Sequence, residues 1–169
     1  MAESWTTVSE LPVHPVGDRS PWTSVEVEGL VEVPLSLNEA GLQSFTKRDS
    51  TDDFRCEEGW VAPDQRWAGV AVADVLDRAR VLPEARHVCF SAGDFSISMP
   101  LQDALESGAL LAYELNGTTL TREHGGPCRL IAPGHTCYFS VKWVERVEVL
   151  AEVPDTNGRE IALSRIGKL

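Results

Sequence analysis

The dipeptide Asn116-Gly117 separates an apolar run, 109–115, from a threonine-rich segment, 118–121. Asn-Gly readily adopts the positive φ angles of a two-residue type I′ turn, which joins two antiparallel strands. The two segments are therefore predicted to form a β-hairpin. Because a lone hairpin is only marginally stable in water, it must pack with further strands into a sheet that has a buried face.

Other segments carry the patterns of strands and short helices. Near the N-terminus, Val25 and Val27 alternate with glutamates, and Gly29 interrupts the pattern where a bend is expected. Glu39 follows Ser36 by three positions, a capping box that predicts a short helix. The other predicted elements are strands at 87–91, 128–132 and 141–150 and helices at 70–80 and 100–106. The predicted class is α+β, mostly mixed β-sheet with a few short helices.

The length of the chain favours one domain. With 169 residues, of which 43% are apolar, it can bury one substantial core but is short for two full domains. We expect a single domain over 1–169, in which the proline-rich segment 1–21 is extended and 151–169 is a C-terminal tail. The polar segment 46–64 lacks periodicity and is expected to be a functional loop.

The charge balance narrows the choice of partners. Asp and Glu number 26 against 15 Lys and Arg, and this acidic field repels phosphate backbones, so no nucleic-acid partner is expected. No apolar run approaches the roughly 20 residues of a membrane helix, and no signal-like segment opens the sequence. We expect a cytoplasmic protein without membrane insertion.

The cysteines lie at positions 56, 89, 128 and 137, without the close pairs of zinc or thioredoxin-like sites. We interpret them as reduced thiols, one of which is a potential metal ligand. Cys56 follows Arg55 in the polar segment, and a neighbouring cation is expected to favour the thiolate that soft, high-valent metals bind. The alternative is a half-buried structural cysteine.

Two further stretches carry polar groups suited to an anionic ligand. In 124–129, paired glycines let the backbone approach a ligand closely, and His124 and Arg129 supply an imidazole and a guanidinium. In 140–143, Ser140 and Lys142 are expected to share one face of an extended strand. The alternatives are a hairpin turn with incidental polar residues and an ordinary strand end with a solvent-facing lysine.

The order of these stretches carries more information than any one of them. The sequence contains a cysteine before Gly59-Trp60, Trp-Ala-Gly-Val at 67–70, His-Gly-Gly-Pro-Cys-Arg at 124–129 and Val-Lys-Trp at 141–143. Together they resemble the molybdopterin-binding domain of the sulfite oxidase family, in the family's order. The resemblance covers roughly 22–149 and includes linking segments such as 111–117 and 99–101.

The resemblance implies a sulfite-oxidase-type fold and a molybdenum ion held by molybdopterin. Cys56 would be the protein's thiolate on molybdenum and the catalytic residue of the chain. The residues implied to hold the pterin and its phosphate are Asp94, His124, Arg129, Ser140, Val141 and Lys142. The arginines available to steer a substrate are Arg19, Arg48, Arg55 and Arg66.

The implied activity is oxygen-atom transfer on a small sulfur or other oxyanion or sulfoxide substrate, with electrons exchanged with a separate partner. Phe139 stands where the family commonly has a basic residue, which favours a neutral or less charged substrate over sulfite. The N-terminal Arg-Asn-His motif of many relatives is absent, and His14 lies at roughly that place. The alternatives are a non-catalytic module that binds or carries the molybdenum cofactor and a cofactor-free interaction domain.

Overall fold

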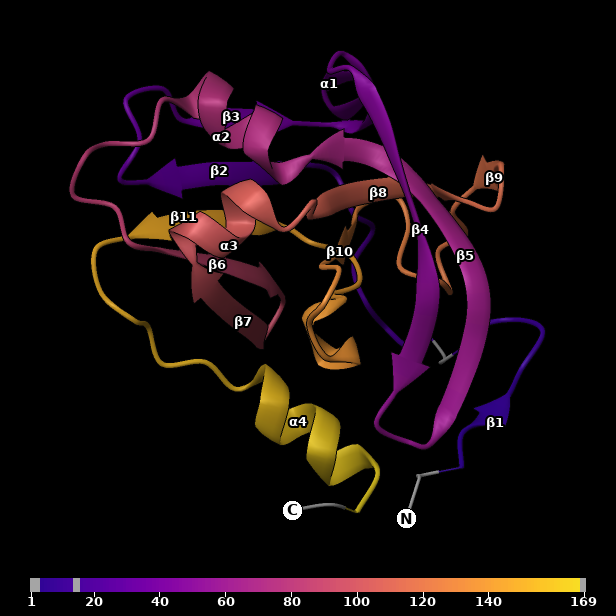
Figure 1. Cartoon of the computed structure of the whole chain (residues 1–169). Helices are drawn as coiled ribbons and strands as arrows, with labels where there is room; N and C mark the ends of the chain where they lie inside the picture. Colours follow the sequence, from indigo (N-terminus) through magenta and orange to yellow (C-terminus); the bar gives the residue numbers. More distant parts are fainter. Residues whose placement is uncertain (1–3, 14–15, 168–169) are drawn as a thin grey trace.

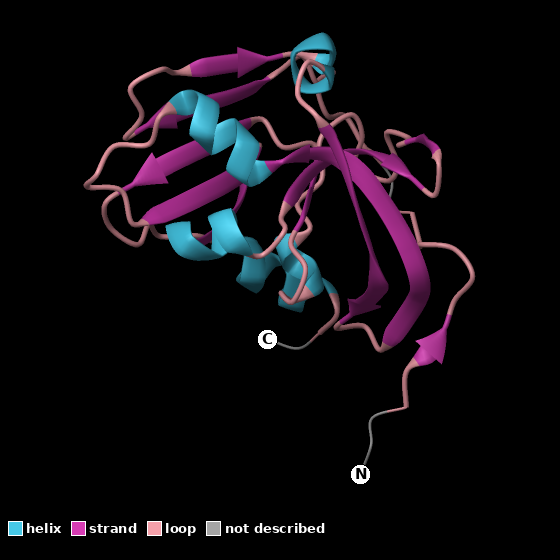
Figure 2. Ribbon diagram, turned by 45° about the horizontal axis from the view of Figure 1, so that its top comes forward, coloured by secondary structure: helices cyan, strands magenta, loops and turns pink. Residues whose placement is uncertain are grey.

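The computed structural model of the chain describes residues 4–13 and 16–167. Within these ranges the strands form two sheets, one of six strands and one of five, and short helices pack against them (Figure 1). Figure 2 shows the two sheets from a second direction, with the helices on the side of the five-stranded sheet. The predicted α+β class, mostly β-sheet with a few short helices, is confirmed.

The six-stranded sheet is built around one long hairpin. Strand β4 (Lys47–Cys56) pairs antiparallel with β5 (Trp60–Ala71), and β5 pairs antiparallel with β8 (Leu110–Leu115). The three short strands at its edges are β1 (Thr6–Thr7), parallel to β5, and β9 (Thr118–Thr119) and β10 (Arg129–Ile131), both antiparallel to β8.

The five-stranded sheet has the order β3-β2-β11-β6-β7. These strands are β2 (Val25–Gly29), β3 (Leu35–Leu37), β6 (His87–Ala92), β7 (Phe95–Pro100) and β11 (Arg146–Leu150). The pair β2 and β11 is parallel, and the other pairs are antiparallel. The helices are α1 (Glu39–Gln43), α2 (Val72–Ala79), α3 (Leu101–Glu106), the 3-10 helix η1 (Cys137–Phe139) and α4 (Gly158–Arg165). None of the helices in the described ranges is long and apolar enough to cross a bilayer.

Several local predictions are confirmed. Asn116 and Gly117 have φ angles of 51° and 84°, as their hairpin turn requires. Val25 and Val27 are fully buried in β2, and the bend at Gly29 is close to β11, because a Cβ there would lie 2.3 Å from the carbonyl oxygen of Val149. The predicted helix at 70–80 is α2, whose buried residues are Val72, Val75, Leu76 and Ala79.

The prediction of a loop at 46–64 is wrong. This segment forms most of the hairpin of β4 and β5, joined by the turn between Cys56 and Trp60. Most β4 side chains are exposed on both faces of the strand, so no alternation marks it as a strand. The ladder to β5 holds β4 instead, with a register shift between Asp52 and Phe54.

Two element boundaries also differ. The N-cap of α1 is Asn38, whose side chain accepts the Gly41 N–H at 2.8 Å, whereas Ser36 lies in β3 and donates to Glu26. The predicted strand 141–150 begins only at β11. Trp143 has a φ angle of 55°, and its N–H donates to the carbonyl of Gly125, so this part of the chain follows the 121–126 turn rather than a sheet.

The two terminal segments also acquire regular structure. The segment 1–21 contributes β1, and His14 lies outside the described residues. The expected C-terminal tail contains α4, which packs beside β7 and η1 (Figure 1). Asn157 fixes the start of α4, because its side chain accepts the N–H of Ser96 and donates to the carbonyl of Asp94.

The main apolar core lies between the five-stranded sheet, helices α1 to α3 and the inner parts of β5, β8 and β10. A smaller cluster on the six-stranded sheet includes Leu11, Trp67 and Leu120. Between β10 and β11 the chain is irregular apart from η1, although Ala132, Val141, Trp143 and Val144 still belong to the main core. This irregular connection, the end of β4 and α4 together surround the site described next.

Candidate functional site

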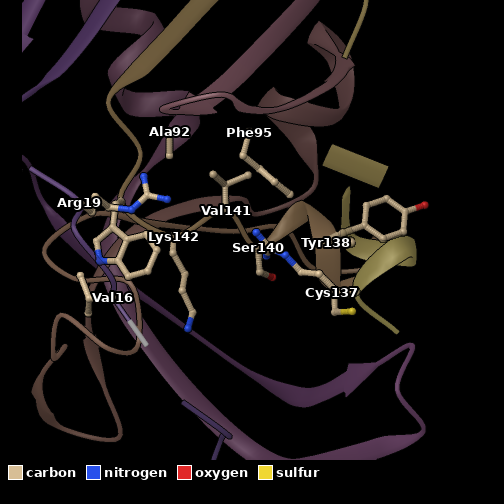
Figure 3. Close-up of a pocket in the computed structure, with 12 residues that line it drawn as sticks. Val16, Arg19, Ala92, Phe95, Cys137, Tyr138, Ser140, Val141 and Lys142 are labelled. Atoms are coloured by element: carbon tan, nitrogen blue, oxygen red, sulfur yellow. The ribbon is translucent and has the colours of Figure 1, made fainter. Parts of the chain in front are cut away.

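Two adjoining cavities lie beside η1 and α4. The first, called the thiol cavity, has a volume of about 140 Å³, and the second, called the Arg19 cavity, has a volume of about 300 Å³ (Figure 3). The residues that line both are Cys137, Tyr138, Lys142, Ala162 and Arg165. The two cavities therefore adjoin at these residues of η1, α4 and Lys142, and together they are called the hollow.

Cys56 lies in the thiol cavity, at the end of β4. It pairs with Trp60 across the hairpin, and the turn between them closes through the N–H of Gly59, which donates to the Cys56 carbonyl at 2.9 Å. Its sulfur lies 3.4 Å from that of Cys137, the first residue of η1. The strand end predicted as a loop thus places Cys56 at a cavity, beside Cys137, to which the sequence assigns no role.

The contact between these thiols changes their acidity. A thiol that remains protonated stabilises the neighbouring thiolate, so the contact lowers the pKa of Cys137 to about 7 and, together with burial, raises the pKa of Cys56. The sequence predicts that the cation of Arg55 favours the Cys56 thiolate, but the Arg55 guanidinium lies beside other groups. Its guanidinium lies 3.5 Å from a carboxylate oxygen of Asp53 and 5.8 Å from the ring of Trp5.

Arg129 supplies a buried cation to the thiol cavity. It lies on β10, only 6% exposed, between the rings of Phe54 and Trp67 at 5.3 and 5.1 Å from their centroids. One Nη donates to the carbonyl of His124 at 2.8 Å, but the buried Nε has no partner. Burial lowers the pKa of Arg129 to about 10, which still leaves it charged at neutral pH.

His124 adds a second buried polar atom without a partner. Its Nδ1 is buried and makes no hydrogen bond within the described structure. Burial, with Arg129 and Lys142 nearby, lowers the pKa of His124, so the imidazole is neutral at neutral pH. A buried donor or acceptor left unpaired is costly, so both Arg129 and His124 are suited to a polar ligand.

Lys142 lines both cavities, whereas Ser140 and Val141 line the Arg19 cavity. The Lys142 ammonium donates to the carbonyl of Glu123 at 2.7 Å, and burial lowers its pKa to about 8. Ser140 ends η1, and the following residues are irregular, so the expectation that Ser140 and Lys142 share one face of a strand is wrong.

The Arg19 cavity carries an excess of positive charge. Arg19, Lys142 and Arg165 line it, and no carboxylate among the described residues does so. Arg19 and Lys142 also lie 4.4 and 5.6 Å from the ring centroid of Trp143. The chain has a net charge of −11, so a cavity whose charged lining residues are all cations is suited to an anion.

The other predicted residues lie elsewhere. Asp94 is exposed at the turn between β6 and β7 and lines neither cavity. Of the four arginines considered for steering, Arg19 alone lines the hollow, whereas Arg48 is paired with Asp74 at 2.8 Å. Arg165 belongs to the segment expected to be a tail, where no pattern in the sequence marks it.

The hollow fits an elongated anionic cofactor that also offers a soft metal. Cys56 and Cys137 line the thiol cavity, and Arg19, Lys142 and Arg165 line the Arg19 cavity. Arg129, whose buried Nε is unpaired, lines the thiol cavity, whereas His124 lines neither cavity. The sequence model of the family described as "Oxidoreductase molybdopterin binding domain" matches residues 11–157. The chain belongs to this molybdopterin-binding family.

Relatives of the family have been named in several organisms. The protein called "Uncharacterized oxidoreductase YuiH" of Bacillus subtilis is 35% identical over 136 residues, which cover 80% of this chain and 68% of that protein. "Sulfite oxidase" of Arabidopsis thaliana is 31% identical over 175 residues, which cover 82% of this chain and 44% of that protein.

A solved structure shows the same fold. The sulfane dehydrogenase SoxCD from Paracoccus pantotrophus matches with a TM-score of 0.73 and 24% identity, over 80% of this chain and 40% of that one. The chain thus spans less than half of the Arabidopsis oxidase and of SoxCD. These likenesses confirm that the chain resembles the sulfite oxidase type of the molybdopterin-binding family, in sequence and in fold.

Proposed function

We propose that the chain is a molybdenum-cofactor-dependent oxidoreductase that transfers an oxygen atom to or from a small sulfur-containing oxyanion or sulfoxide. The observation that carries this proposal is the joint hollow, in which Cys56 lies at one part and Arg19, Lys142 and Arg165 border the other. In this proposal the protein exchanges electrons with a separate partner protein and is located in the cytoplasm.

The side chains divide the work of holding the cofactor. Cys56 would hold the metal through its thiolate, and the buried guanidinium of Arg129 would contact the pterin from the lining of the thiol cavity. The imidazole of His124 would contact the pterin through its unpaired Nδ1. Lys142, with Ser140 and Val141, would hold the phosphate at the Arg19 cavity. When bound, molybdenum and its dithiolene supply the two-electron chemistry, while the protein positions and tunes them.

The lining of the thiol cavity supports this substrate class. Arg129, Lys142 and Arg165 line it together with Glu57 and Glu58. Positive groups beside a reacting centre favour an oxyanion or the polar oxygen of a sulfoxide. The three basic side chains thus supply the attraction for such a substrate.

Phe139, in place of the family's basic residue, favours a neutral substrate at the level of sequence. This residue lines neither cavity, and its ring packs against His135 and Tyr138, with centroids 4.8 and 5.4 Å away. The aromatic ring therefore removes no charge from the thiol cavity, where Arg165 supplies a cation from α4. The argument from Phe139 against sulfite does not apply to this cavity.

The test is the molybdenum content, by elemental mass spectrometry, of protein expressed with molybdate. We expect nearly one molybdenum per chain in the wild type, and loss or altered metal-to-sulfur absorption in Cys56→Ser. Cys89→Ser is the matched control, because Cys89 lies on β6, lines neither cavity and is half-buried like Cys56. Folded wild-type protein without molybdenum or pterin would contradict the proposal.

Loaded protein is then tested with sulfite and sulfoxides, using dyes as electron carriers. Turnover that disappears in Cys56→Ser supports oxygen-atom transfer at this site. Bound cofactor that is inert toward all of these substrates would support the carrier module instead.

A further inference from the structure

Two sulfur atoms from distant parts of the chain meet in the thiol cavity. The sulfurs of Cys56 and Cys137 lie 3.4 Å apart, although the residues are 81 positions apart in the sequence. Cys137 also accepts the backbone N–H of Glu57 at 3.4 Å, which fixes its sulfur against the end of β4. Metal ligation by Cys56 uses one of the two thiols and leaves Cys137 without a role.

We propose that Cys56 and Cys137 form a site of oxidative modification, a dithiol that closes into a disulfide in the cofactor-free protein. A disulfide has a sulfur–sulfur bond of about 2 Å, so the two sulfurs must approach by about 1.4 Å to form it. The blocking of cofactor uptake, argued below, rests on the proposed function. The formation of the disulfide does not.

The chemistry is balanced with a peroxide as oxidant. One thiol attacks a peroxide oxygen, which gives a sulfenic acid and one water when hydrogen peroxide is used. The second thiol then attacks the sulfenic sulfur, forms the S–S bond and releases a second water. The two thiols lose two protons and two electrons in total, and the peroxide takes them up to give two waters.

The reaction is selective for this pair. All four cysteines lie within the described ranges and are free thiols. Cys128 is fully buried, and Cys89 lies opposite Ser98 and Glu148 in the five-stranded sheet, away from another sulfur. Cys56 and Cys137 instead lie beside each other and both line a cavity, where a small oxidant reaches them.

The modification controls the metal site in a simple way. A sulfur in a disulfide has no thiolate to offer to a metal. The oxidised, cofactor-free protein therefore does not accept the molybdenum cofactor until a reductant releases Cys56. Cofactor already bound protects Cys56 from the same reaction.

The full chain, produced in cells that lack the cofactor, is exposed to hydrogen peroxide, alkylated in denaturant and studied by mass spectrometry. We expect an intact mass lower by two hydrogens and a linked peptide pair that contains Cys56 and Cys137. The number of alkylated thiols falls from four to two, and dithiothreitol restores all four. Cys89→Ser forms the same link, whereas Cys137→Ser forms none and oxidises at Cys56 alone.

Four alkylated thiols after peroxide, or separate sulfinic acids on Cys56 and Cys137, would overturn the inference. Uptake of the molybdenum cofactor by the oxidised protein without reductant would overturn its regulatory part. A disulfide in a protein that takes up no molybdenum even when reduced would leave the dithiol site in place and contradict the proposed function. Molybdenum uptake by a protein that forms no disulfide would support the proposed function and contradict the dithiol site.

Discussion

The backbone of Gly125 lies directly against the side chain of Lys142. A Cβ placed on Gly125 would lie 2.6 Å from Cγ and 2.8 Å from Cβ of Lys142, and Gly125 has a φ angle of 97°. The same turn carries the Gly125 carbonyl that accepts the N–H of Trp143. Gly125 thus leaves the space that the side chain of Lys142, in the Val-Lys-Trp motif, occupies.

Gly125→Ala is therefore expected to displace Lys142 and to reduce the uptake of cofactor. Gly134→Ala is the matched control, because Gly134 also has a positive φ angle, 81°, but has nothing within 4 Å of its Cβ position. Both variants lose about 1–3 kcal/mol of stability from backbone strain. Only Gly125→Ala also loses molybdenum per folded chain, measured by elemental mass spectrometry. Equal molybdenum contents in the two variants would show that Lys142 tolerates the added methyl group.

Arg129→Met separates a role in binding from a role in stability. The side chain is a buried cation, and none of the ion pairs among the described residues includes it. Replacing a buried charge by an apolar side chain of similar size is often neutral or stabilising. We expect the cofactor-free variant to melt no lower than the wild type, while cofactor affinity falls roughly 10- to 100-fold, the value of one or two hydrogen bonds from a charged donor.

The exposed Arg48→Met is the control for this substitution, since it breaks only the ion pair with Asp74 and should leave cofactor affinity unchanged. Calorimetry of the cofactor-free proteins and titration with cofactor provide the two readouts. A lower melting temperature of Arg129→Met together with normal affinity would mean that Arg129 is a structural residue.

Lys142 predicts a pH dependence of stability. Burial, followed by the charges of Arg129 and Arg165, lowers the pKa of Lys142 to about 8 from its ordinary value of 10.5. Between these two values the folded state has released the proton while the unfolded state still binds it. Because stability rises with pH wherever the unfolded state binds more protons, the wild type gains stability from about pH 8 to about pH 10.

Lys142→Met lacks this gain, whereas Arg129 is present in both proteins and its titration largely cancels. The free energy of unfolding, measured with urea across this pH range, should therefore rise more with pH in the wild type than in Lys142→Met. A bound anion near the ammonium opposes the effect. A difference that stays constant with pH would contradict the burial of this amine.

The sequence predicts the elements whose pattern reflects local rules. The turn at Asn116 and the buried face of α2 follow from backbone preference and helical spacing, so both are confirmed. Strand β4 escapes prediction because its charged side chains face solvent on both sides, and its hydrogen bonds to β5 are the stabilising feature. Such pairing depends on residues distant in sequence, which a local pattern does not contain.

The candidate site likewise combines residues that local motifs predict with residues that only the fold brings to it. Cys56, Arg129 and Lys142 were found from ordered motifs, and the fold gathers them at one hollow. Cys137 and Arg165 were missed as site residues, since each reaches the hollow only through the path of η1 and α4. Asp94 was predicted from a weak match and lies outside the lining, where its carbonyl accepts a hydrogen bond from Asn157.

Helix α4 carries two exposed arginines, one in its first turn and one in its last. Arg159 and Arg165 are both exposed, but only Arg165 lines the two cavities, and its charge helps to lower the pKa of Lys142. Reversing either charge changes the net charge of the chain equally, so general repulsion of anions is the same in both variants. Arg165→Glu is expected to weaken the binding of an anionic substrate roughly fivefold, because an exposed charge contributes about 1 kcal/mol or less. Arg159→Glu should leave binding unchanged. KM for sulfite at two salt concentrations gives the readout: a loss confined to Arg165→Glu and reduced by salt supports a local role of α4, and equal losses in both variants would mean that only the overall field of the protein matters.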